Sequence, residues 1–385
     1  MTVTVSKPAL ILREEISALK KPSGIKGEEL LRSNTVSDAY TALNPVMFRN
    51  RIINGDMRID QRNASASVTT SALQQLTYTV DRWAYYNDVV SKRTIQQVTT
   101  APPGFKNSLK VTVISTDTAG PQQFLRQTIE GYNLADLNWG TPSAQPAVLS
   151  FWVRSSIVGQ HGGAIQSTNT DWCFPFAYYI NVADTWEYKT VQISGATIGS
   201  WGSTNNAGAS IQFENGVGYQ KSPANVWLAV NSTASTGSVN LCATNGATWY
   251  ITGVQFEKGT VATPFEFRPF PVELALCQRY YWQHSISVWV SAILDGSSSD
   301  YPGAFIQHPV PMRITPTGSF LSVQSFYYNN GSSGVSFIPS GGTTNWVGNN
   351  IVGYLRKDAI SNPPGVAHCM KVGFWYIQCA FNAEF

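Results

Sequence analysis

Residues 248–257 carry the clearest indication of the fold, and they read Thr-Trp-Tyr-Ile-Thr-Gly-Val-Gln-Phe-Glu. Aromatic and β-branched residues make up most of this stretch, and both types favour extended strands. The apolar positions do not follow helical spacing. The stretch therefore predicts a β-strand.

Similar short runs precede it along the chain. They lie at 109–114, 124–129, 148–154, 186–193 and 226–230, and turn-forming sequences such as Ala-Pro-Pro-Gly, Thr-Pro-Ser and Asn-Asn-Ala-Gly separate them. Repeated short strands of this kind are typical of two packed sheets. We predict an all-β protein in which residues 46–270 form a jelly-roll β-sandwich.

The last part of the chain returns to β character after a break. A helical turn is expected at 270–281, and strands are expected at 286–294, 304–306, 318–326, 334–338 and 372–381. Long loops of Gly, Ser and Asn separate these strands, and such loops on a rigid scaffold are common binding surfaces. Residues 271–385 are therefore predicted to be a distal β domain.

The N-terminal segment, residues 1–45, differs from the rest. Charged residues make up 11 of the first 40 positions but only 38 of the other 345. Between residues 8 and 21, Leu12, Ile16 and Leu19 fall on one helical face. We expect a short amphipathic helix that attaches to a partner or to copies of itself; a solvated helix folded back on its own domain is the alternative.

Composition limits the function. Charged residues are 13% of the chain and the net charge is +3, against a usual share of about 25%, so nucleic acid is not an expected partner. No apolar run has the length of a signal peptide or a membrane span. We therefore expect synthesis in a cytoplasm, no membrane insertion and no ordinary secretion.

The five cysteines have no metal-site spacing and are expected to be buried thiols.

The sequence contains no recognised catalytic constellation. The four histidines lack metal-ligand spacing, and no nucleophile elbow, phosphate loop or dinucleotide motif occurs. We expect no enzyme activity, no metal and no cofactor. Asp295 and Asp300 form the one acidic pair in an exposed-looking distal loop, where they are typical of turn residues, although two carboxylates also serve glycosidases.

Sugar binding needs an aromatic face and a few amide or hydroxyl groups. The distal domain offers both in predicted loops, where the candidates for receptor binding are Tyr301, Tyr327, Tyr328, Trp346 and Asn349. In the sandwich, Trp172 and Trp201 are secondary candidates because they lie among Asn, Thr and Ser. For each ring, the alternative is packing in a core or a subunit interface.

A set of motifs lies at 50–62, 79–83, 251–259, 262–266, 277–281, 308–313, 316–317 and 382–385. Together these motifs resemble those of bacteriophage tail fibres and related receptor-binding virion proteins. The resemblance implies a carbohydrate-binding-module-like jelly roll followed by a distal β domain, assembled as a homotrimer.

The same resemblance implies a place and partners. The protein would belong to the virion tail, be made in the host cytoplasm and be released by lysis. Its N-terminus would hold a tail, baseplate or adaptor protein, and its distal part would bind host polysaccharide or lipopolysaccharide. Two alternatives stay open: a glycan-degrading tailspike enzyme, and a decoration or neck protein without a receptor.

Overall fold

The computed structural model describes residues 48–70, 75–89, 92–119, 122–167, 171–294, 303–329, 334–337, 352–356 and 369–385. The chain divides into two compact units, Met1–Arg49 and Asn50–Phe385. All elements below belong to the second unit. The helix expected at residues 8–21 lies outside the described residues.

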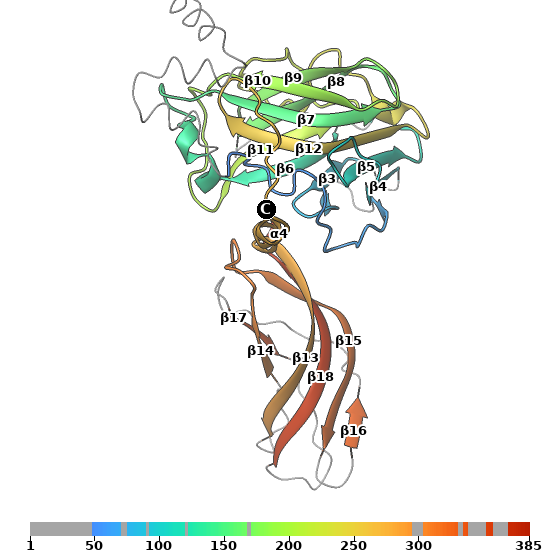
Figure 1. Cartoon of the computed structure of the whole chain (residues 1–385), viewed down its shortest axis with the longest axis vertical. Helices are drawn as coiled ribbons and strands as arrows, with labels where there is room; N and C mark the ends of the chain where they lie inside the picture. The colour runs from blue at the N-terminus through green and yellow to red at the C-terminus, as the bar shows by residue number, and fades with distance from the viewer. Residues whose placement is uncertain are drawn as a thin grey trace, which may run out of the picture. The chain divides into compact units, whose positions relative to one another are not determined.

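Two six-stranded antiparallel sheets form a β-sandwich (Figure 1). Sheet A contains, in spatial order, β1 (Val68–Thr69), β4 (Arg93–Val98), β5 (Ser108–Val113), β12 (Thr248–Lys258), β7 (Ala147–Ser155) and β10 (Glu187–Ile193). Sheet B contains β2 (Gln75–Tyr78), β3 (Ala84–Asn87), β6 (Gln123–Glu130), β11 (Ala207–Glu214), β8 (Gly159–Ser167) and β9 (Cys173–Ile180). Short 3₁₀ helices occur at Gly131–Asn133, Ala135–Leu137 and Leu241–Ala243.

The core lies between the two sheets. In β7, Phe151 and Val153 point inward, and Trp249 and Ile251 do the same in the neighbouring β12. From sheet B, the Phe213 ring meets the Phe151 ring edge-on, with 5.0 Å between centroids. Aromatic side chains bury large apolar areas, so these rings hold the two sheets together. The prediction of an all-β jelly-roll sandwich is confirmed.

Most strand predictions are confirmed to within one residue, since the runs at 109–114, 124–129, 148–154, 186–193 and 248–257 correspond to β5, β6, β7, β10 and β12. The strand expected at 226–230 is wrong. There only Leu228 forms an isolated bridge, to Cys173. Asn225 has a left-handed backbone with φ of 64°, and the Trp227 side chain packs against the core. A turn and a packed ring replace the strand.

Sequence patterns do not predict β8, which reads Gly-Gln-His-Gly-Gly-Ala-Ile-Gln-Ser, because glycine weakens strands. A Cβ on Gly162 would collide with the side chain of Ser238, and one on Gly163 would collide with the Phe176 ring and the Gln212 backbone. Glycine is therefore required by close packing on both faces of this strand.

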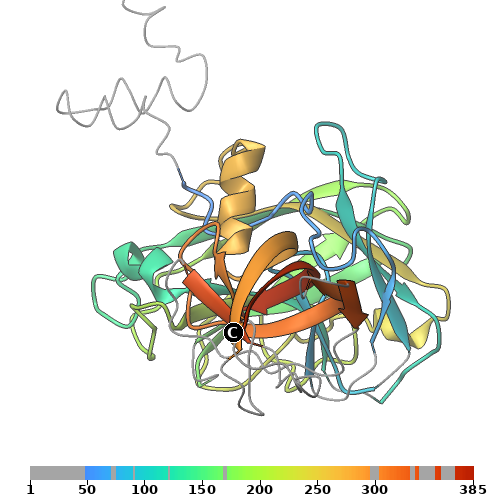
Figure 2. The same cartoon turned by 90° about the horizontal axis from the view of Figure 1, so that it is seen from below.

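After the sandwich, the chain forms α4 (Phe270–Gln278), which confirms the expected helical turn, and two further sheets (Figures 1 and 2). The larger sheet has the order β13 (Tyr281–Leu294), β18 (Cys369–Asn382), β15 (Thr317–Asn329) and β16 (Gly334–Phe337). The smaller sheet pairs β14 (Gly303–Gln307) with β17 (Val352–Arg356). The domain boundary expected near residue 270 stays a prediction. In the described part of the chain, no helix is long and apolar enough to span a membrane.

The C-terminal tail contacts the beginning of the sandwich. The Glu384 carboxylate forms an ion pair with Arg82, and both side chains are almost fully buried. The same carboxylate lies 3.1 Å from Nη2 of Arg62. Removing one partner of a buried ion pair costs about 3–5 kcal/mol, because the other charge is left buried without a partner.

Candidate functional site

The structure describes only some of the residues predicted to bind. Tyr327 and Tyr328 lie in strand β15, opposite Ser336 and Val335 of β16, rather than in a loop. The remaining candidates, Tyr301, Trp346, Asn349, Leu12, Ile16 and Leu19, lie outside the described residues, as do Asp295 and Asp300.

Trp201 belongs to a cluster of three tryptophans. Its ring meets the rings of Trp139 and Trp227 edge-on, with centroids 4.8 and 5.3 Å apart. The indole N–H groups of Trp139, Trp201 and Trp227 donate to the backbone carbonyls of Gln145, Ile198 and Ser194, respectively. Since the cluster packs against the core and its polar atoms have partners, its main role is structural.

Trp172 lies close to this cluster. A Cβ on Gly199 would lie 3.1 Å from the Trp172 ring and 3.2 Å from Nε1 of Trp201. The backbone of Gly199 is left-handed, with φ of +101°, a conformation that glycine adopts without strain. The fold therefore brings the two predicted tryptophans of the sandwich to the same place, and both are partly buried.

A second aromatic surface lies on the outer face of sheet A. Trp152 of β7 and Tyr188 of β10 are directly paired across the strands, and their ring centroids are 5.4 Å apart. Both alternate with core residues of their strands, so both point away from the core. Tyr188 is 44% exposed, which leaves part of its ring free for a ligand.

Phe105, Phe265 and Phe267 extend this surface. Their three centroid distances are 4.8, 5.2 and 5.2 Å, and Phe267 is 55% exposed. At Gly253, a Cβ would lie 3.1 Å from the Trp152 ring and 2.7 Å from the Phe105 ring. Gly253 therefore has a ring of each group beside it, and the absence of a Cβ leaves room for both. We call Phe105, Trp152, Tyr188, Phe265 and Phe267 the aromatic band.

Two cations lie beside the aromatic band on the same face. Tyr250 of β12 is paired with Lys110 of β5 and with Arg154 of β7. The two cationic groups lie 5.6 and 5.1 Å from the Tyr250 ring centroid, respectively. Arg154 also pairs with the exposed Asp184 at 3.2 Å. This face therefore combines apolar rings with polar groups.

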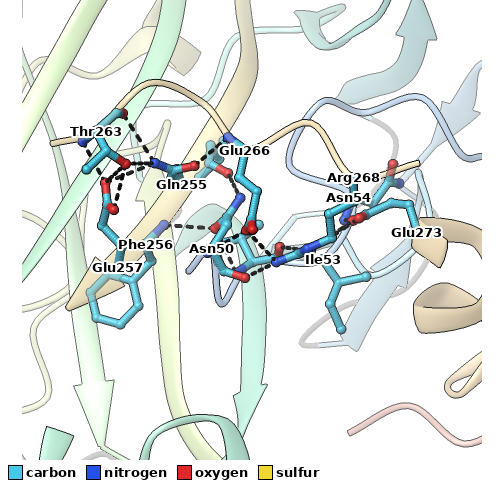
Figure 3. A network of polar contacts seen from close by, with 12 residues as sticks. Asn50, Ile53, Asn54, Gln255, Phe256, Glu257, Thr263, Glu266, Arg268 and Glu273 are labelled. Atoms are coloured by element: carbon cyan, nitrogen blue, oxygen red, sulfur yellow. Dashed lines mark hydrogen bonds and ion pairs between the residues drawn. The ribbon is translucent and has the colours of Figure 1, made fainter. Parts of the chain in front are cut away.

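A polar network fixes the loop that supplies two rings of the band (Figure 3). Asn50 receives backbone hydrogen bonds from Ile52 and Phe256, both at 3.0 Å, and donates to the carbonyl of Val254 at 3.0 Å. It thereby joins residues 50–52 to β12.

Arg268 is the cation of this network. It donates to the carbonyls of Asn50 and Ile52 and lies 3.2 Å from Glu273 and 3.4 Å from Glu266. Its guanidinium satisfies carbonyls and carboxylates that burial would otherwise leave without partners. The small pocket at this network has no space for a water molecule, so we assign the network a structural role.

The 259–268 loop is held at two further points (Figure 3). The backbone N–H of Glu266 donates to Oε1 of Gln255 at 2.8 Å, and the N–H of Thr263 donates to Oε1 of Glu257 at 2.8 Å. These bonds lie on either side of Phe265 in the sequence. The loop therefore places its phenylalanines against Phe105 with little freedom.

The sequence contains a signal for the aromatic band that loop composition does not reveal. In the strand 148–154, Trp152 alternates with Phe151 and Val153, and in 186–193 Tyr188 alternates with the buried Val191 and Ile193. A large aromatic residue on the solvent side of a strand is a candidate for binding.

The described residues contain no other clear chemical centre. No three His, Cys, Asp or Glu side chains among them gather to hold a metal ion. Cys173, Cys242 and Cys277 are buried free thiols. Burial also raises the pKa of Asp81 to about 7 and that of Asp56 to about 6.

No protein-family model matches the chain, and no curated protein matches it. Solved structures do. The chain is similar to the enzymatically active domain of tailspike protein 4 of bacteriophage CBA120, with 13% identity over 55% of this chain and 22% of that chain, and a TM-score of 0.28. The chain thus spans about a fifth of the length of that tailspike domain.

Two smaller proteins are matched over nearly their whole length. A putative sugar-binding protein from Bacteroides thetaiotaomicron has 15% identity over 55% of this chain and 100% of that chain, with a TM-score of 0.31. A xylan-binding domain from Paenibacillus barcinonensis has 11% identity over 52% of this chain and 99% of that chain, with a TM-score of 0.24. These likenesses concern the fold.

Proposed function

We propose that this protein is a glycan-binding component of a phage tail fibre, and that the aromatic band is its glycan-binding surface. The observation that carries the proposal is the group of five rings on the outer face of sheet A, in which Trp152 contacts Tyr188 and the three phenylalanines contact one another, with Tyr188 and Phe267 about half exposed. The apolar face of a pyranose stacks on such rings, and neighbouring polar groups bind its hydroxyls.

Two features of the aromatic band support a role in binding rather than a role in folding alone. Trp152 and Tyr188 do not contribute to the core between the sheets, and two hydrogen bonds, from the backbone N–H groups of Thr263 and Glu266, hold the loop on either side of Phe265. A rigid aromatic surface loses little conformational entropy when a ligand binds.

The attachment role rests on the resemblance to tail fibres. In a homotrimer, three weak glycan sites act together, so their combined strength exceeds that of a single site. The N-terminal segment would hold a tail, baseplate or adaptor protein. The low charge of the β part suits adhesion to neutral or mixed-charge surface polysaccharide.

Binding of purified protein to host polysaccharide tests the proposal. We expect Tyr188→Ala and Trp152→Ala to weaken binding roughly tenfold each, which corresponds to about 1.4 kcal/mol per lost stacking contact. Tyr179→Ala is the matched control, because Tyr179 is a 57% exposed tyrosine on the edge strand of sheet B. Equal losses in Tyr179→Ala and Tyr188→Ala would contradict the assignment of the surface.

Two further measurements test the rest of the proposal. The polysaccharide should keep its chain length after incubation with the protein, whereas a tailspike enzyme would shorten it. The solution mass should be about three times the chain mass of 42.1 kDa. A mass equal to that of one chain would rule out the trimer.

A further inference from the structure

A row of side chains next to the aromatic band carries an excess of positive charge. The register of sheet A places Lys110 of β5, Tyr250 of β12 and Arg154 of β7 side by side. Each follows or precedes a core residue on its strand, so all three point away from the core. Trp186, directly before β10, adds a second ring, whose centroid lies 6.1 Å from that of Tyr250. We call these four residues the cationic row.

The cationic row lies within reach of a sugar chain that binds the aromatic band. Arg154 follows Trp152 by two positions on β7, and residues two apart on a strand share a face at a spacing of about 6.6 Å. That spacing is close to the length of one pyranose. A glycan that runs along the strands and stacks one sugar on Trp152 and Tyr188 would therefore bring its next sugar to the cationic row.

Lys110 is a partly exposed cation without a carboxylate partner. Within the described chain, its ammonium forms no ion pair and no hydrogen bond, and it lies 5.6 Å from the Tyr250 ring centroid. Contact with the face of a ring positions an ammonium but uses none of its hydrogen-bond donors in an N–H···O bond. The three N–H groups are therefore available to an oxygen of a ligand.

Arg154 has a carboxylate partner that a ligand can replace. Its Nη2 lies 3.2 Å from Asp184, whose side chain is exposed, and exposed ion pairs contribute little to stability. Nε of Arg154 has no hydrogen-bond partner in the part of the chain that the structure describes. Lys110 and Arg154 together with Asp184 leave one positive charge in excess.

We propose that Lys110 and Arg154 make the glycan site selective for an acidic glycan, an inference that rests on the function proposed above. A sugar that bears a carboxylate would lie over the cationic row, next to the sugar stacked on the aromatic band. The Arg154 guanidinium suits a carboxylate because it can donate two parallel N–H bonds. Both cationic groups lie within 6 Å of the Tyr250 ring centroid, and a single carboxylate balances the excess charge.

Two forms of one ligand test this selectivity. Oligogalacturonate has a carboxylate on every sugar, and chemical reduction of these groups to alcohols gives a neutral oligosaccharide with the same linkages. In calorimetric titrations of the full chain, we expect the acidic form to bind at least about fivefold more tightly at low salt. The difference should shrink as salt is added, because salt screens the attraction between exposed charges.

Variants separate the charge contribution from ring stacking. Lys110→Gln and Arg154→Gln should each weaken binding of the acidic form about fivefold and leave binding of the neutral form unchanged. Lys258→Gln is the matched control, because Lys258 is an exposed lysine at the far end of β12 from Tyr250. It removes the same charge and should retain both affinities.

Trp152→Ala distinguishes failure of this inference from failure of the proposed function. We expect it to weaken binding of both forms, because both place a sugar on the aromatic band. Equal affinity of the unmodified protein for the two forms, or equal losses in Lys110→Gln and Lys258→Gln, would overturn the selectivity and leave the aromatic band intact. Unchanged binding in Trp152→Ala, with a loss in Lys110→Gln, would instead overturn the aromatic band and support the cations. No binding of either form would overturn both.

Discussion

Replacing Asn54 tests how the first turn of the compact unit is stabilised. Asn54 is fully buried and has a left-handed backbone with φ of 57°. Its Nδ2 donates to the carbonyls of Ile59 and Asp81 at 2.8 and 3.0 Å, and its Oδ1 accepts from the N–H of Ile59 at 3.0 Å. Asn54→Ala removes all three hydrogen bonds and leaves their backbone partners buried.

The expected loss follows from two contributions. Three hydrogen bonds at a net value of about 1 kcal/mol each give a loss of about 3 kcal/mol. Alanine at a positive φ adds about 1 kcal/mol relative to glycine. We therefore expect the free energy of unfolding to fall by about 4 kcal/mol in Asn54→Ala and by about 3 kcal/mol in Asn54→Gly.

Urea unfolding of the full chain, followed by both tryptophan fluorescence and circular dichroism, measures these losses. Asn225→Ala is the matched control, because Asn225 is exposed, has φ of 64° and has no side-chain hydrogen bond with a described residue. It should lose only about 1 kcal/mol or less. A loss in Asn54→Ala no greater than that in Asn225→Ala would refute the reasoning.

Three other changes have defined outcomes. Gly55→Ala should lower the free energy of unfolding by about 1–3 kcal/mol, because its Cβ would overlap the carbonyl oxygen of Val254, and urea unfolding measures the loss. Burial raises the pKa of Asp81 from 3.8 to about 7, so the protonated carboxyl contributes its full share to the free energy of unfolding below about pH 4, and that share is lost as the pH rises through 7. Asp81→Asn should therefore reduce the fall in the free energy of unfolding between pH 4 and 7. An unchanged slope in the variant would contradict this prediction. Trp201→Ala should lower the thermal midpoint because its ring packs in the tryptophan cluster, and loss of glycan binding at an unchanged midpoint would show a binding role instead.

Local sequence patterns predict those strands whose side chains alternate clearly. The runs at 109–114 and 148–154 have this pattern and form β5 and β7. They do not predict β8, because Gly162 and Gly163 are required by contacts with residues 238, 176 and 212, which are distant in the sequence. The same patterns wrongly predict a strand at 226–230, where the chain instead turns at Asn225 and packs the Trp227 ring against the core.

The candidate sites also depend on contacts between residues that are distant in the sequence, which local patterns do not predict. Composition identifies Trp172 and Trp201, which the fold brings together around Gly199. Trp152 and Tyr188 lie inside predicted strands, so attention to loops misses them, although alternation places both on the outer face. The pairing of Trp152 with Tyr188 depends on the register of β7 and β10, and single-sequence patterns carry no information about that register.

The ion pairs of Glu384 also have a consequence for synthesis of the protein. Arg62 and Arg82 leave the ribosome more than 300 residues before their common carboxylate does. Until then, the guanidinium of Arg82 has no Glu384 partner, and burying it is costly. We therefore expect a chain that lacks Glu384 to hold the Arg82 guanidinium without its carboxylate and to unfold more readily than the chain that contains it.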